Sequence, residues 1–97
     1  MATVIYSNDA LDDISRAYDD YEFRQPGLGE RFVGRLATLS EAIGRIPELY
    51  GEVCLGVRAA MPNKFPFVVY YRIEGNTVDV IAVLHGATDS AVWQSRV

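Results

Sequence analysis

The stretch KFPFVVYYRIEGNTVDVIAVLHGATD, residues 64 to 89, decides the fold of this chain. Two runs rich in β-branched and aromatic residues flank Gly75 and Asn76, which tolerate the positive φ that a two-residue hairpin turn needs. With these two residues as the loop, Arg72 lies opposite Asp79. The stretch therefore predicts a long antiparallel β-hairpin, followed at once by a polar loop with the only histidine, His85.

An unbroken ladder pairs Tyr70 with Ile81 and Phe67 with Leu84, and it divides the side chains between two faces because they alternate along a strand. The apolar set should face the core: Phe67, Val69, Tyr71, Ile73, Val78, Val80, Ala82 and Leu84. The other set is half apolar and half charged: Val68, Tyr70, Arg72, Asp79, Ile81, Val83 and His85. A slip of one residue would exchange the faces, so this assignment depends on the turn.

Length and composition indicate one small domain, residues 1–97. A chain of 97 residues buries roughly 60–65% of its unfolded surface, which is enough for one two-layer core. No segment approaches the roughly 20 apolar residues of a membrane span, and no signal-peptide pattern opens the chain. The single cysteine, Cys54, excludes an internal disulfide framework and fits a reducing compartment. We therefore expect a cytoplasmic protein with no membrane partner.

The net charge limits the class of partner. Thirteen acidic residues stand against nine basic ones, which gives a net charge of −4. Affinity for nucleic acid that does not depend on sequence comes from Lys and Arg neutralising phosphates. The balance disfavours RNA or DNA as the main binding partner, although it leaves room for a local basic patch.

Two amphipathic helices are predicted before the hairpin. Residues 2–6 form a short β-rich run, and Ser7 or Asn8 can cap the helix that follows. Its inward stripe is Leu11, Ile14, Tyr18 and Tyr21, with the acids, Asp13 among them, on the other side. After a break at 25–27, a second helix should run from about 29 to 46 and present Leu28, Phe32, Leu36, Leu39, Ile43 and Ile46. Gly34 and Gly44 weaken this helix, and a close approach to a neighbouring helix would compensate.

The remaining segments complete the fold class. A short strand is predicted over 56–61, with Val57, Ala59 and Met61 alternating against Arg58 and Ala60. The tail from 89 to 97 can hold one helical turn capped by Asp89 or Ser90. The order is strand, helix, helix, strand, strand, strand. We therefore predict an α+β domain with a helical hairpin packed on one face of a mostly antiparallel sheet.

Few residues could carry chemistry. One histidine and one cysteine cannot supply the three or four ligands of a metal site, and no cofactor-binding motif is present, so no metal or cofactor is expected. His85 is the one candidate for acid–base work, the alternative being a hydrogen bond to Asp89 or the backbone. Arg58 and Arg72 should both point from the half-polar face. Asp79 is an ion-pair partner for Arg72, whereas Arg58 has none in view.

The apolar members of the half-polar face suggest a surface for binding. Both helices are needed on the opposite face, which leaves a contiguous patch of Val68, Tyr70, Ile81 and Val83. Exposed patches of this kind mark protein partners. The alternative is that the tail, with Val92 and Trp93, folds over the patch.

The chain resembles the RelE/ParE toxins of bacterial type II toxin–antitoxin (plasmid stabilisation) systems. The resemblance rests on PGLGERF at 26–32, IPELYGEV at 46–53, GVRAAM at 56–61 and the hairpin at 64–89, where FP-x-x-YY-R-x-EG and VLHG are fairly specific. It implies the same first strand, helical hairpin and three-strand sheet that the periodicity predicts. It also implies a cognate antitoxin whose C-terminal arm wraps the toxin in a hetero-oligomer.

Two kinds of target follow from the resemblance. RelE-like members cut messenger RNA on the ribosome with several basic residues, whereas ParE-like members inhibit DNA gyrase by protein–protein contact. Arg58 and Arg72 occupy positions of family arginines, His85 and Asp89 match the family's HG-x-x-D pattern, and Trp93 falls near its terminal aromatic position.

The loop after His85 favours the ParE-like branch. Ala87 and Thr88 stand where the family often carries basic residues, and Lys64 is the only lysine. We therefore predict a gyrase-directed toxin. Its partner-binding face would be Arg58, Val68, Tyr70, Arg72, Ile81, Val83, His85 and Trp93. The alternatives are a ribosome-dependent ribonuclease using Arg58, Arg72 and His85, and a non-toxic remnant that only binds its antitoxin.

Overall fold

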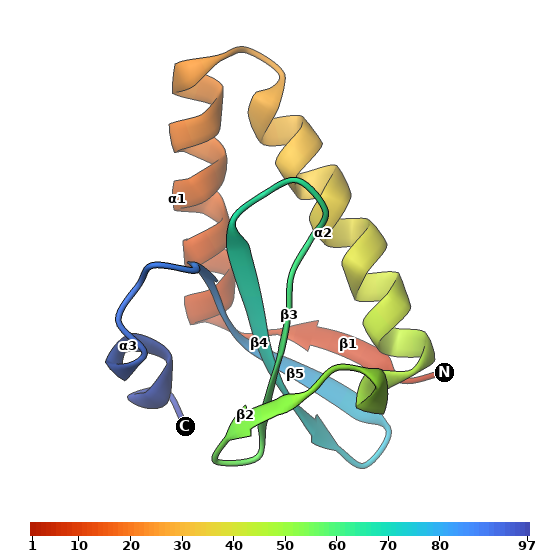
Figure 1. The fold of residues 1–97 in the computed structure, drawn as a ribbon. Coiled ribbons are helices and arrows are strands. Elements are labelled where there is room, and N and C mark those ends of the chain that lie inside the picture. Colours follow the sequence, from red (N-terminus) through yellow and green to blue (C-terminus); the bar gives the residue numbers. More distant parts are fainter.

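A helical hairpin covers one face of a five-stranded sheet in the computed structural model, which describes all residues 1–97 (Figure 1). The hairpin consists of α1 (Asn8–Arg24) and α2 (Leu28–Arg45). The sheet order is β1-β5-β4-β3-β2, with β1 parallel to β5 and every other pair antiparallel. The predicted α+β class, with its helical hairpin and mostly antiparallel sheet, is confirmed.

The strands are β1 (Thr3–Tyr6), β2 (Glu52–Cys54), β3 (Val57–Ala60), β4 (Phe67–Glu74) and β5 (Thr77–His85). A 3-10 turn, η1 (Pro47–Leu49), precedes β2, and the short α3 (Ala91–Gln94) ends the chain. The sequence did not predict β2, because three residues carry too little alternation to indicate a strand. We call the sheet surface under the helices the helix face, and the opposite surface the open face.

The helices begin and pack largely as their sequences predict. The Ser7 hydroxyl oxygen accepts from the Ala10 amide at 3.1 Å and caps α1. On α2 the predicted residues Phe32, Leu36, Leu39 and Ile43 are buried. On α1 the prediction is partly wrong, because the buried residues are Ala10, Asp13, Ala17 and Tyr21.

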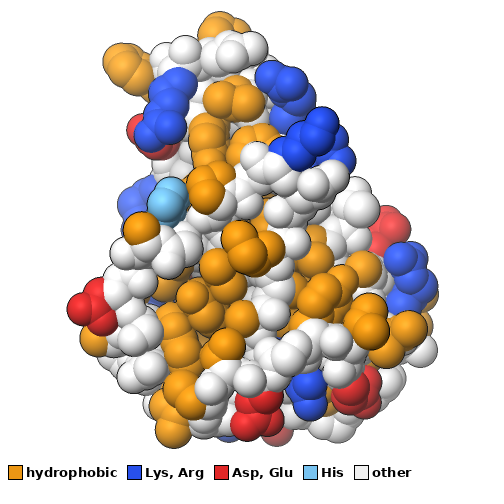
Figure 2. All heavy atoms as spheres, viewed as in Figure 1, with side chains coloured by type: hydrophobic (Ala, Val, Ile, Leu, Met, Phe, Trp, Pro, Cys, Tyr) orange, Lys and Arg blue, Asp and Glu red, His pale blue; other side chains and the backbone are white.

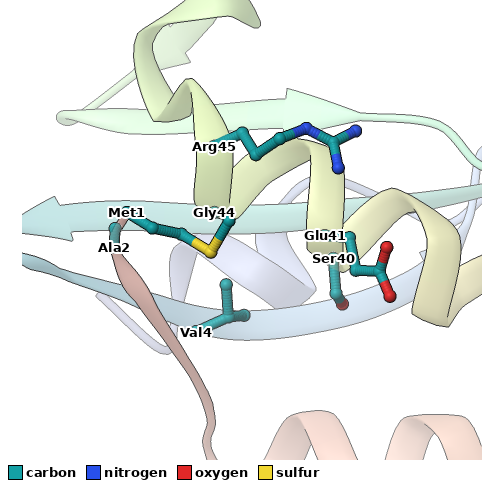
Figure 3. A pocket seen from close by; sticks show the side chains of 7 residues that line it. All are labelled: Met1, Ala2, Val4, Ser40, Glu41, Gly44 and Arg45. Atoms are coloured by element: carbon teal, nitrogen blue, oxygen red, sulfur yellow. The ribbon is translucent and has the colours of Figure 1, made fainter.

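The close approaches of glycine differ from the prediction. The two helices meet at Gly29, where an added Cβ would lie 2.7 Å from the Tyr18 carbonyl oxygen. Gly44 instead approaches the N-terminal strand, since its carbonyl accepts from the Ala2 amide at 2.9 Å (Figure 3). These segments border the largest hollow on the molecule, about 410 Å³, whose polar side chains are Ser40, Glu41 and Arg45. Gly34 has open space around it.

The β4–β5 hairpin keeps the predicted register only near its turn. Arg72 pairs with Asp79, and Tyr71 with Val80, as expected. Tyr70 then pairs with Ala82, so Ile81 is the extra residue of a β-bulge. The predicted pairs farther from the turn, Tyr70 with Ile81 through Phe67 with Leu84, are therefore wrong by one residue.

The bulge exchanges the faces of the last part of β5. Val83 is fully buried among the helix-face residues, and Ala82 turns to the open face. The predicted assignment of Val83 to an exposed patch is wrong for this reason. The molecule thus has a large core between helices and sheet, and a second small core on the open face formed by Val57, Ala82 and Trp93.

Candidate functional site

The C-terminal segment covers part of the open face of the sheet. The Trp93 ring stacks on Tyr70 with centroids 5.0 Å apart and planes at 18°, and Trp93 is only 4% exposed. Burial raises the pKa of the Tyr70 hydroxyl. The alternative reading of the patch is therefore confirmed, because the tail folds over it. Val68 and Ile81 stay half-buried at its margin.

A buried carboxylate that the sequence placed on the polar side of α1 fastens this tail. Asp13, with a side chain 1% exposed, accepts from Arg96 Nη1 at 2.6 Å and Nη2 at 3.1 Å. It also accepts from the Val83 amide at 3.0 Å and from Arg16 at 2.9 Å. The hydrogen bonds between Arg96 and Asp13 raise the pKa of Arg96, while partial burial of the guanidinium acts in the opposite direction.

Asp13 and Arg96 together supply hydrogen-bond partners for the part of β5 that has no neighbouring strand. β1 ends at Tyr6, opposite Val80, so β5 has no neighbour on that side from Ile81 onward. Buried backbone groups need hydrogen-bond partners. Asp13 takes the Val83 N–H, and Arg96 donates to the Ile81 carbonyl at 3.1 Å. A helical spacing through Ala10, Asp13 and Ala17 was the signal in the sequence that could have revealed Asp13.

Arg58 lies on the helix face, and its predicted position on the half-polar face is wrong. It pairs with Tyr71, which is in the main core. Its Nη1 donates to the Tyr50 carbonyl at 2.7 Å and to the Glu48 carbonyl at 3.2 Å. The Tyr71 hydroxyl donates to the Pro47 carbonyl at 2.7 Å. Both side chains therefore hold the segment between α2 and β2 against the sheet.

Replacing Tyr71 with phenylalanine should remove a pH dependence as well as a hydrogen bond. Burial raises the pKa of Tyr71 from 10.0 to about 12. Because the folded state favours the neutral phenol, the associated stability is complete below pH 10 and is lost as the pH rises toward 12.

We expect Tyr71→Phe to lower the free energy of unfolding by about 1 kcal/mol near neutral pH. The variant should then lose less stability than the wild type in strongly alkaline buffer. Urea unfolding on either side of the pKa of Tyr71 measures both effects. Parallel losses in the two proteins would show that another group titrates.

Arg72 and His85 also contact residues close to them in the sequence. Arg72 lies opposite Asp79 as predicted, but its ion pair is with Glu74 at 3.7 Å, so the predicted Asp79 pair is wrong. His85 is exposed, and its Nδ1 accepts from the Ala87 amide at 3.0 Å. This hydrogen bond is the backbone alternative given above. The ring also meets Phe67 edge-on at 5.6 Å.

The structure does not bring the three candidate ribonuclease residues together. Arg58 pairs with Tyr71 while His85 pairs with Phe67, four positions along β4. That separation corresponds to about 13 Å of strand. Arg72 follows Tyr71 directly and therefore points from the opposite face of the sheet.

The surface between the two helices is open and apolar. A groove of about 360 Å³ runs there, lined by Tyr6, Leu11, Ile14, Val33, Leu36, Ala37 and Ser40. Leu11, which the sequence placed in the core, is 50% exposed on its rim. No group of three His, Cys, Asp or Glu side chains gathers as a metal ligand set. None of the three helices combines the length and the apolar composition that a membrane span requires.

These features define a small two-layer α+β domain in which Asp13, Arg58 and Arg96 hold separate segments of the chain together. Residues 4–90 match the model of a protein family described as the ParE toxin of the type II toxin-antitoxin system parDE. The chain belongs to this ParE toxin family. No curated protein matches the chain.

A solved structure is also similar to the chain. It is a chain of the chromosomal ParDE TA system from P. aeruginosa, with a TM-score of 0.77 and 17% sequence identity. The match covers 88% of this chain and 96% of that one. The RelE/ParE fold implied by the sequence motifs is therefore confirmed.

Proposed function

We propose that this ParE-family toxin inhibits DNA gyrase by protein–protein binding and that a cognate antitoxin neutralises it. The observation that carries the proposal is the separation of Arg58, Arg72 and His85. A ribonuclease needs cations on the developing charge and an acid or base within hydrogen-bond reach of the same phosphate. Here Arg58 is bound to two carbonyls, and Arg72 points from the other face of the sheet.

The antitoxin part of the proposal is supported by the open groove between α1 and α2. An amphipathic helix buries its apolar face in such grooves. Leu11 and Val33, 50% and 40% exposed, supply the apolar rim that a partner helix would cover. The P. aeruginosa relative comes from a ParDE toxin–antitoxin system, which is consistent with this role.

The gyrase proposal is tested by supplying the purified protein with both classes of target. One reaction contains gyrase, ATP and supercoiled plasmid, and the other contains translating ribosomes with a defined message. We expect trapped, cleaved plasmid in the first reaction and intact message in the second. Cut message with unaffected gyrase would overturn the proposal in favour of the ribonuclease. No effect in either reaction would leave the antitoxin-binding remnant.

The variant His85→Ala separates binding from acid–base catalysis. Loss of a general acid or base costs about 10²–10⁴-fold in rate. We expect gyrase inhibition by His85→Ala to stay within roughly twofold of the wild type, because the imidazole contacts only the local loop and Phe67. Growth arrest on induction, compared with wild type and an empty vector, gives the same readout in cells. A collapse of toxicity with an unchanged fold would contradict it.

A further inference from the structure

A groove runs along α2, on the side that faces the loop between β3 and β4. Two adjoining hollows of about 220 and 290 Å³ share Arg35 as a common wall. The first is lined by Leu28, Arg31, Arg35, Lys64 and Phe65. The second continues past Leu39 and Met61 to Tyr50, whose carbonyl is held by Arg58. One end of the groove is therefore cationic, and the other combines the apolar side chains of Leu39 and Met61 with the polar Thr38 and Asn63.

The cations of this groove have no acidic partner. Arg16, Arg24, Arg72 and Arg96 form all the ion pairs of the molecule. Arg31, Arg35 and Lys64 form none, and no acid lines their hollow. Figure 2 shows Lys and Arg side chains gathered over α2, above an otherwise largely apolar and uncharged surface. In a protein of net charge −4, this concentration of free positive charge is a local exception.

The backbone conformation at Lys64 is also unusual. Its φ is +71°, in the left-handed region that disfavours residues with a side chain. Such a conformation persists where the surrounding structure imposes it, and it is frequent at binding sites. Here it belongs to the loop that carries the Lys64 ammonium to the wall of the groove opposite Arg31 and Arg35.

We propose that this groove binds an extended acidic segment of a partner protein. From Leu28 to Ala42 the helix rises about 21 Å, the length of about six residues of extended chain. Arg31 and Arg35 are one turn apart, so their guanidinium groups can each take a carboxylate. An apolar side chain of the same segment would then lie on Met61. This surface is separate from the groove between the two helices and does not depend on which target the toxin inhibits.

The shape and charge favour a peptide over nucleic acid. A nucleic-acid site needs a row of cations along several phosphates, whereas the positive charge here stops after Arg35. Met61 is 59% exposed at the wall of the second hollow, so the continuation of the groove can take an apolar side chain.

The test uses a fluorescein-labelled peptide of two leucines, one alanine and three glutamates, with fluorescence anisotropy as the readout. We expect saturable binding that weakens with added salt. The double variant R31E/R35E should weaken binding roughly tenfold or more. Lys64→Glu tests the opposite wall in the same way.

Arg45→Glu is the matched control, because Arg45 lies on α2, outside the groove and without an ion pair. It should leave binding within about twofold of the wild type. A peptide with lysines in place of the glutamates should not bind. Thermal unfolding of each variant confirms that it is folded.

Three outcomes would overturn the proposal. They are no binding of the acidic peptide, equal losses for R31E/R35E and Arg45→Glu, and tighter binding of a labelled thymidine oligonucleotide than of the peptide. The last would assign the groove to nucleic acid instead.

Discussion

Replacing Asp13 with alanine should lower the free energy of unfolding by about 3–5 kcal/mol, because it leaves the partly buried guanidinium of Arg96 without its carboxylate partner and the buried Val83 amide without an acceptor. Arg96 would lose both of its strong hydrogen bonds, and the Val83 amide would lose its only acceptor across the strand edge. For a domain of this size each kcal/mol shifts the melting temperature by about 4–8 °C. We therefore expect Asp13→Ala to melt more than about 12 °C below the wild type.

Asp12→Ala is the matched control for this prediction. Asp12 is the adjacent acid of α1, is exposed and makes no hydrogen bond or ion pair with its side chain. Its loss should change the free energy of unfolding by less than about 0.5 kcal/mol. Urea unfolding of both variants gives the comparison. Equal effects would show that the carboxylate of Asp13 does not fasten the tail.

Arg96→Ala and the double variant complete the measurement. If the two groups act as one unit, the double variant should be little worse than Asp13→Ala, which a double-mutant cycle reveals. Additive losses would instead mean that each side chain is stabilised by other contacts, such as the approach of Arg96 to Asp9 at 4.0 Å.

The parts of the fold that the sequence predicts are those with local signals. Gly75 and Asn76 locate the turn, and Ser7 and the apolar spacing of α2 locate the helices. In each of these cases, the residues that decide the element lie within a few positions of one another. The helical hairpin and the mostly antiparallel sheet follow from them.

The bulge at Ile81 lacks such a signal. From Val80 to Leu84 every residue is apolar, so the period-two contrast that reveals the orientation of a strand is missing. One inserted residue then moves Val83 to the helix face and Ala82 to the open face. The face of Arg58 is equally hidden, because its neighbours Ala59 and Ala60 are alike.

The prediction of the candidate site failed for a different reason, because the residues that meet there are far apart in the sequence. Asp13 and Arg96 are 83 positions apart, and Trp93 meets Tyr70 from a separate segment. The sequence predicts that an acid such as Asp13, in a polar stretch, faces solvent. Only the tertiary structure shows that β5 has no neighbouring strand next to Asp13. Five of the eight arginines make ion pairs or side-chain hydrogen bonds within the domain, while Arg31, Arg35 and Arg45 make none.

Removing the ring of Trp93 should have the second large effect. Trp93→Ala should cost about 3 kcal/mol or more, because it empties the open-face core and exposes Val57 and Ala82. The stacking on Tyr70 would also be lost. Chemical unfolding followed by far-ultraviolet circular dichroism measures the change. Val92→Ala is the control, since Val92 lies in the same turn but is 37% exposed.

Trp93 is the only tryptophan, so its fluorescence also reports whether the tail is docked. In Arg96→Ala, which frees the tail from Asp13, the emission should shift toward that of a solvent-exposed indole at denaturant concentrations that leave the helices intact. That result would make the tail a separately opening unit of low local stability. If Trp93→Ala is as stable as Val92→Ala, and the emission changes only with global unfolding, then the tail is neither a second core nor a separate unit.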